Sequence, residues 1–140
     1  MDVTPVSLKL CTPLQIRFGS FLGGPIAAIY YLKENFSVLG KSAEARKTVF
    51  WGVAIVVGMM ISIPFLPDRF PHYVIPLAYA YAAGAVAEKW QLGKQAIVDS
   101  GKYQFQSNWR VCGLALLSMI AFIGILFVEI FCLVQLGWMK

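Results

Sequence analysis

Charged side chains are scarce in this sequence. Asp, Glu, Lys and Arg make up 14% of the 140 residues, while hydrophobic residues make up 59%. Soluble domains carry about 25% charged residues, so this shortage excludes an ordinary water-soluble domain. The length suits one compact unit. We therefore predict a single transmembrane domain over residues 1–140.

Residue types that build catalytic and metal sites are equally scarce. His72 is the one histidine, and Asp68 is the carboxylate nearest to it in sequence. One residue of each type is too few for a dedicated zinc site. Cys11, Cys112 and Cys132 form no C-x-x-C pair, and we interpret them as small apolar filler. No nucleophile, base and orienting group converge in the sequence, so we predict no enzymatic activity, no cofactor and no metal.

Long apolar runs, in contrast, are abundant. Four segments extend over about residues 14–32, 49–66, 73–88 and 111–136. A membrane-spanning helix needs about 20 such residues. The second and fourth segments qualify outright, the third is short, and the first requires Arg17 to lie at the interface. The sequence therefore predicts an all-α polytopic membrane protein, a four-transmembrane-helix bundle made of two hairpins.

The distribution of Lys and Arg predicts the orientation. The connections at residues 33–48 and 89–110 hold four basic residues each, and the opposite side would hold four in total. By the positive-inside rule both connections are cytoplasmic and both termini are extracytoplasmic. This topology accounts for the net charge of +5, so we predict no nucleic-acid partner. Five cations of the connections are candidates for a docking surface, with a solvated loop as the alternative: Lys41, Arg46, Lys47, Lys94 and Lys102.

Small residues recur every four positions in the first segment. They predict a smooth helix face, and in lipid such faces let helix backbones approach closely. The face comprises Gly19, Ser20, Gly23, Gly24, Pro25, Ala27 and Ala28. Pro25 lacks an amide donor and is expected to kink the helix. A kinked packing helix is the favoured interpretation, and a discontinuous helix that binds an ion or a substrate is the alternative.

Two ionisable residues fall within the predicted spans. Glu129 lies in the fourth segment, and a carboxylate inside a membrane is costly unless it is paired or faces water. Arg17 lies at the start of the first segment, which gives it the same outer depth in a four-span topology. We predict that Glu129 pairs with Arg17 as a clamp between the first and fourth helices, or else protonates. An ion path is the alternative role.

Several short motifs carry a resemblance to known membrane proteins. They are Gly23-Gly24-Pro25-Ile26-Ala27-Ala28, Asn35-Phe36, Leu39-Gly40-Lys41, Ile75-Pro76, Gly93-Lys94-Gln95-Ala96-Ile97 and Ser107-Asn108-Trp109. With these motifs the chain resembles a group of small bacterial four-helix membrane proteins. The resemblance implies four spans and a bacterial inner membrane, and it implies no activity. Members of the group tend to carry a histidine and a glycine pair in the second cytoplasmic loop, where this chain has residues 98–102, so no role of that histidine is transferred.

Two functions follow as candidates. The first is a non-enzymatic integral membrane protein that acts through helix–helix or protein–protein contacts, as an assembly subunit, a regulator or an immunity-type protein. Its partner within the bilayer would be another membrane protein or a second copy of the chain. The alternative is a small oligomeric channel or transporter that uses the Pro25 break and Glu129. Pores need polar linings, and these segments supply few polar residues, so we favour the first.

Overall fold

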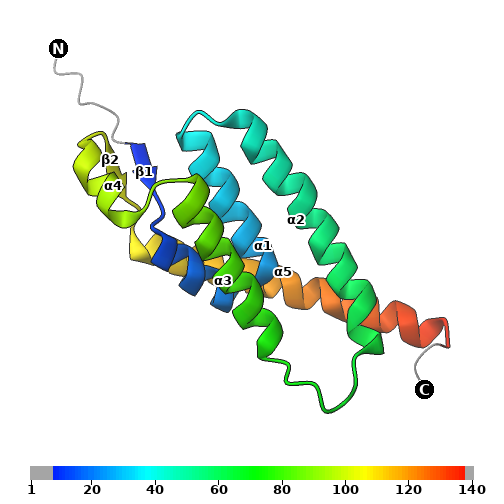
Figure 1. Ribbon diagram of the computed structural model, residues 1–140. Helices are drawn as coiled ribbons and strands as arrows, with labels where there is room; N and C mark the ends of the chain where they lie inside the picture. Colours follow the sequence, from blue (N-terminus) through cyan, green and yellow to red (C-terminus); the bar gives the residue numbers. More distant parts are fainter. Residues whose placement is uncertain (1–7, 138–140) are drawn as a thin grey trace.

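The computed structural model describes residues 8–137, which are mostly helical (Figure 1). Its elements in chain order are β1 (Leu8–Leu10), α1 (Pro13–Val38), α2 (Ser42–Ser62), the 3-10 helix η1 (Ile63–Phe65), α3 (Val74–Trp90), α4 (Lys94–Ser100), β2 (Tyr103–Phe105) and α5 (Asn108–Gln135). The first seven residues and Lys140, which entered the predicted orientation of both termini, lie outside the described residues. The all-α prediction therefore holds for the architecture, with one short strand pair added.

Helix α1 folds back on itself at Gly24. Gly24 has φ 78° and ψ −173°, which lies outside the helical region. Glycine adopts such a positive φ more readily than other residues. Pro25 follows it directly. Asn35 is 24 residues beyond Cys11, which would be about 36 Å along a straight helix. Instead its side-chain amide makes hydrogen bonds of 2.9 and 2.8 Å to the Cys11 backbone. Helix α1 is therefore a hairpin of two half-helices, residues 13–23 and 25–38.

This hairpin corrects the first predicted span. Residues 14–32 do not form one straight helix, because the chain reverses near the middle of that segment. The predicted kink at Pro25 has the right place, but the change of direction is far larger than a proline alone produces. The reason is the positive φ of Gly24, a backbone conformation that residues with a Cβ rarely adopt. It reverses the direction of the chain just before Pro25.

The hairpin is the hub of the fold. Helices α3, α5 and α2 all pack against α1. The core formed between them is made of small and medium-sized side chains: Cys11, Ile16, Ala27, Ala28, Tyr31, Leu32, Ala83, Ala87 and Val111. Small residues at these contacts let the helices approach α1 closely.

The other three predicted spans are helices, with shifted bounds. The second begins seven residues earlier than predicted, at Ser42, and the fourth begins at Asn108. The connection predicted at residues 33–48 is mostly helical, and the one predicted at 89–110 contains α4 and β2. By length and composition, two described helical segments are able to cross a membrane, Ser42–Phe65 and Asn108–Gln135.

The molecule has two chemically distinct ends. At one end, β1 pairs in parallel with β2, Leu8 opposite Tyr103, and the Lys41 Nζ donates to the Trp90 carbonyl at 2.9 Å. We call this the loop end; Figure 1 shows β1, β2 and α4 together there. The other, which we call the turn end, holds residues 66–73 between η1 and α3. The prediction that the chain before the first helix lies opposite the 89–110 connection is therefore wrong for residues 8–12.

Candidate functional site

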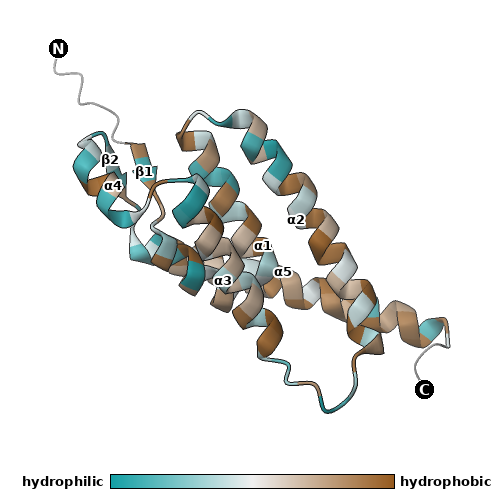
Figure 2. Cartoon of the chain, in the orientation of Figure 1, coloured by the Kyte–Doolittle hydropathy of each residue, from teal (hydrophilic) through white to brown (hydrophobic). Residues whose placement is uncertain are grey.

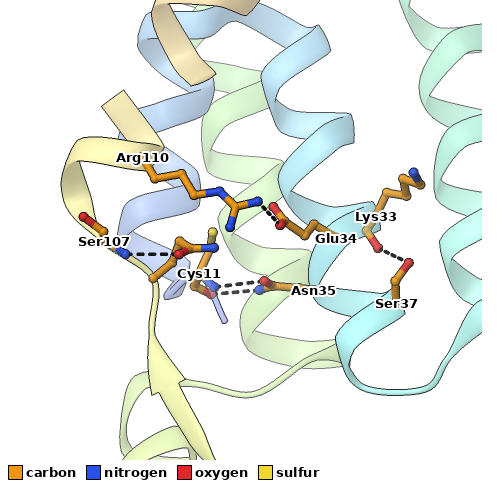
Figure 3. A network of polar contacts seen from close by, with 8 residues as sticks. Cys11, Lys33, Glu34, Asn35, Ser37, Ser107 and Arg110 are labelled. Atoms are coloured by element: carbon orange, nitrogen blue, oxygen red, sulfur yellow. Dashed lines mark hydrogen bonds and ion pairs between the residues drawn. The ribbon is translucent and has the colours of Figure 1, made fainter. Parts of the chain in front are cut away.

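A buried amide network joins the two ends of the α1 hairpin. Asn35 is only 2% exposed; its Nδ2 donates to the Cys11 carbonyl at 2.8 Å and to the Gln91 Oε1 at 2.9 Å, while its Oδ1 accepts from the Cys11 amide. The Gln91 Nε2 donates in turn to the Leu32 carbonyl at 3.0 Å. Figure 3 shows the paired bonds between Cys11 and Asn35. One side chain therefore fixes the entry and exit of the hairpin against the end of α3.

A second amide group fixes the start of α1 to the start of α5. Thr12 and Gln15 form a capping box at the N-terminus of α1. The Gln15 Nε2 also donates to the Gln106 carbonyl at 2.8 Å and to the Asn108 Oδ1 at 2.6 Å. The Gln106 amide donates to the Leu10 carbonyl at 2.9 Å. These bonds continue the pairing of β1 with β2 and close the loop end.

Cys11 lies inside this network. Burial, and secondarily the negative charge of Glu34, raise the pKa of its thiol from 9.0 to about 12. Glu34 itself pairs with Arg110 at 2.8 Å, from the first turn of α5 (Figure 3). A thiol with such a pKa stays protonated near neutral pH and is a poor nucleophile. Cys11 therefore acts as buried filler, as the sequence predicts.

Arg17 pairs with Glu88, and the predicted pair with Glu129 is wrong. The Arg17 Nη2 lies 2.9 Å from the Glu88 Oε1 on α3, and its guanidinium lies over the Tyr81 ring at 5.3 Å. The aliphatic part of Arg17 packs where Gly84 leaves room for it. The reason for the correction is the hairpin, which places Arg17 near the loop end.

Glu129 lies toward the turn end instead. It lines a cavity of about 540 Å³ between η1, α3 and α5, and Asp68 and His72 line the same cavity from the 66–73 turn. Among residues 8–137, no ion pair includes Glu129. Within the same range, no three His, Cys, Asp or Glu side chains are grouped closely enough to hold a metal ion.

All seven residues of the predicted small-residue face are buried. Gly23 lies against the α5 backbone, where an added Cβ would be 2.8 Å from the Ala115 Cα and carbonyl oxygen. Gly19 lies against the Tyr31 ring of the other half-helix, and the Tyr31 hydroxyl donates to the Val111 carbonyl at 2.6 Å. The face therefore packs within the hairpin as well as against another helix.

The five candidate docking cations are exposed and lie at the loop end. Lys41 is engaged with the Trp90 carbonyl, Lys47 pairs with Glu44 at 3.2 Å, and Lys102 lies over the Tyr103 ring at 5.6 Å. Arg46 and Lys94 are also exposed. Together these five cations make the loop end basic.

The comparisons add nothing to this geometry. No family model, no curated protein and no solved structure matches the chain. The site is therefore interpreted from its own contacts.

Three residues of the loop end were missed from the sequence. The sequence does not single out Asn35 or Gln91 as packing residues, or Glu88 as the partner of Arg17. A usable signal was present, since polar residues that flank apolar helices need hydrogen-bond partners when they are buried. Their partners lie far away along the chain, so the sequence does not identify them.

Proposed function

We propose that the chain is an integral membrane protein that crosses the bilayer with α2, α3 and α5 and enters it with α1 as a re-entrant hairpin. The observation that supports this most is the exposure of apolar helices. In the most apolar windows of α2 and α5, 0% and 11% of the residues are buried. Figure 2 shows hydrophobic residues along most of both helices. Neither helix is a buried core helix or lies near the N-terminus, so lipid is the environment that suits these surfaces.

The hairpin itself suits a re-entrant position. Each half-helix of α1 is shorter than the about 20 residues that a crossing needs. A backbone break at membrane depth is tolerated where protein covers it, and the Gly24 turn is buried against the Phe122 ring of α5. Both ends of α1 then lie on the side of the loop end.

The charge distribution supports the same topology. Because the hairpin moves Lys9 and Arg17 to the loop end, ten of the eleven Lys and Arg residues in the described chain gather there. The ten are Lys9, Arg17, Lys33, Lys41, Arg46, Lys47, Lys89, Lys94, Lys102 and Arg110. Arg69 alone lies at the turn end. By the positive-inside rule the loop end is cytoplasmic, in the inner membrane of a bacterium if the resemblance holds.

Within the membrane we propose a non-enzymatic role through helix contacts, as an assembly subunit, a regulator or an immunity-type protein. Helix α5 carries an exposed seam opposite the face that packs on α1: Gly113, Leu117, Ile120, Gly124 and Phe131. Its members are spaced by four, three, four and seven residues, which keeps them on one face of the helix, as in helix-packing seams. Among residues 8–137, nothing outside the adjacent backbone of α5 lies within 4 Å of a Cβ added at Gly113 or Gly124. The seam therefore has room for a helix of another membrane protein or of a second copy.

Photo-crosslinking tests this role. A photoreactive phenylalanine at Ile120, which is 64% exposed and on the seam, is expected to give one discrete adduct in native membranes. The matched control is Ile125, which is 41% exposed and about 140° away around α5 from Ile120. It is expected to give at least about threefold less adduct, because it lies off the seam. Equal or absent adducts at both positions would contradict the contact role, and release of the protein by carbonate washing would contradict membrane integration.

The channel or transporter alternative is favoured by one observation. Ser20 is fully buried one turn before the Gly24 break, and its hydroxyl has no hydrogen-bond partner among residues 8–137. Transporters use such broken helices to bind ions. Glu129, however, lies in a separate cavity toward the turn end. Ion leakage from reconstituted vesicles above an empty control, abolished by Glu129→Gln, would favour this alternative.

A further inference from the structure

Two hollows of different chemistry meet at Arg17. The first is a cleft of about 980 Å³ at the loop end, lined by the start of α1, the start of α4 and the β2–α5 connection. The second is a groove of about 340 Å³ between α1 and α3, lined by Phe18, Phe21, Leu77, Ala80 and Tyr81. Arg17 lines both hollows. A ligand that occupies the two together needs a polar part and an apolar part.

The cleft favours an anionic group. Its charged lining residues are Arg17, Lys94 and Glu88, so one positive charge remains after Arg17 pairs with Glu88. A guanidinium has five N–H donors, and the bond to Glu88 uses one of them. Lys94 is exposed and makes no ion pair among residues 8–137. A phosphate group complements this combination of Lys and Arg.

The groove favours a hydrocarbon chain. All of its lining residues except Arg17 are apolar or aromatic, and Phe18, Leu77 and Tyr81 are more than half exposed. From Arg17 the groove extends one helical turn along α1 to Phe21 and from Tyr81 back along α3 to Leu77, away from the loop end. The Tyr81 ring beneath the guanidinium marks the border between the polar and apolar parts.

We propose that this composite site binds one anionic phospholipid from the cytoplasmic leaflet, with its phosphate at Arg17 and Lys94 and an acyl chain in the groove. The proposal rests on the proposed membrane location. Arg17 lies four residues into α1, about 6 Å from its start, which suits the depth of a headgroup. Basic pockets between membrane helices on the cytoplasmic side bind anionic headgroups in the same way. The acyl chain would occupy the groove between α1 and α3.

Native mass spectrometry of the delipidated protein in detergent tests the site. We expect phosphatidylglycerol to bind with at least about fivefold higher affinity than phosphatidylcholine of the same chain length, because the quaternary ammonium of phosphatidylcholine cancels its phosphate charge and weakens the attraction to Lys94 and Arg17. Lys94→Gln is expected to remove this preference. Lys102→Gln is the matched control, because Lys102 is also an exposed cation of the loop end but does not line the cleft. It should leave the preference unchanged.

A second pair of variants tests the groove. Leu77→Trp fills the groove without replacing a charged residue and is expected to weaken phosphatidylglycerol binding at least about fivefold, since steric filling excludes the acyl chain. Leu116→Trp, on the exposed surface of α5 and outside the seam, should have no effect. Thermal unfolding within about 3 °C of the parent confirms that the variants are folded.

Three results would overturn the site: equal binding of both lipids by the parent protein, unchanged binding in Leu77→Trp, or displacement of the lipid by millimolar inorganic phosphate. The last result would assign the cleft to free phosphate instead of a lipid. Failure of the membrane location itself would be recognised separately, as release of the parent protein by carbonate washing. A protein that stays in the membrane without lipid preference contradicts only this inference.

Discussion

Replacing Asn35 by leucine is expected to destabilise the fold by about 3 kcal/mol or more. Leucine has a similar volume, but it leaves the amide and carbonyl of Cys11 and one oxygen of Gln91 without their partners. Each buried polar group that loses its hydrogen bond costs about 1–3 kcal/mol. For a chain of this size the melting temperature in detergent should fall by about 10 °C. Because Asn35 joins both ends of the hairpin, the loss would also free β1 from the end of α3.

The matched control is Gln95→Leu. Gln95 also uses its side-chain amide, donating to the Asp99 carboxylate at 3.0 Å, but this pair is exposed on α4. Water replaces a lost exposed hydrogen bond, so the unfolding free energy should change by less than about 0.5 kcal/mol. Equal melting temperatures for the two variants would show that Asn35 does not hold the hairpin closed.

The second large effect concerns Gly23 at the contact between α1 and α5. In Gly23→Ala the new methyl group would lie 2.8 Å from the Ala115 Cα and carbonyl oxygen. These are backbone atoms, which cannot rotate away, so α5 must shift. Overpacking of this kind costs about 1–3 kcal/mol, and we expect the melting temperature in detergent to fall accordingly.

Gly58→Ala provides the control with the opposite sign. Gly58 is also a helical glycine, in α2, but in the described part of the chain nothing outside the adjacent helix backbone lies within 4 Å of a Cβ added there. Alanine favours a helix over glycine by about 1 kcal/mol, so this variant should be unchanged or more stable. If Gly23→Ala and Gly58→Ala moved the melting temperature in the same direction, close packing at Gly23 would be refuted.

Some of this fold follows directly from the sequence. The lengths of the second and fourth apolar segments predict α2 and α5. In an α-helix the backbone amide and carbonyl groups of an apolar segment form hydrogen bonds within that segment. The four-residue spacing of glycine and alanine predicts a close-packed face, and its members are buried. Pro25 marks where α1 is interrupted. These features depend on local chemistry, which a sequence displays.

The direction of the chain after Gly24 does not follow from the sequence. A kinked span and a closed hairpin have the same local pattern, and the contact that distinguishes them joins Asn35 to Cys11, 24 residues away. The predicted straight first span also gave the wrong ionic partner for Arg17. A single span would have placed Arg17 at the depth of Glu129, whereas the hairpin returns it to the loop end beside Glu88.

Accessibility of single cysteines tests the re-entrant topology most directly. Lys9→Cys, Asp68→Cys and Lys102→Cys would each be made in a chain whose three native cysteines are replaced by alanine, and labelled with a membrane-impermeant maleimide in intact bacterial cells. We expect Asp68→Cys to be labelled at once, and both Lys9→Cys and Lys102→Cys to be labelled only after permeabilisation. Labelling of Lys9→Cys in intact cells while Lys102→Cys stays protected would restore four crossings and contradict the hairpin.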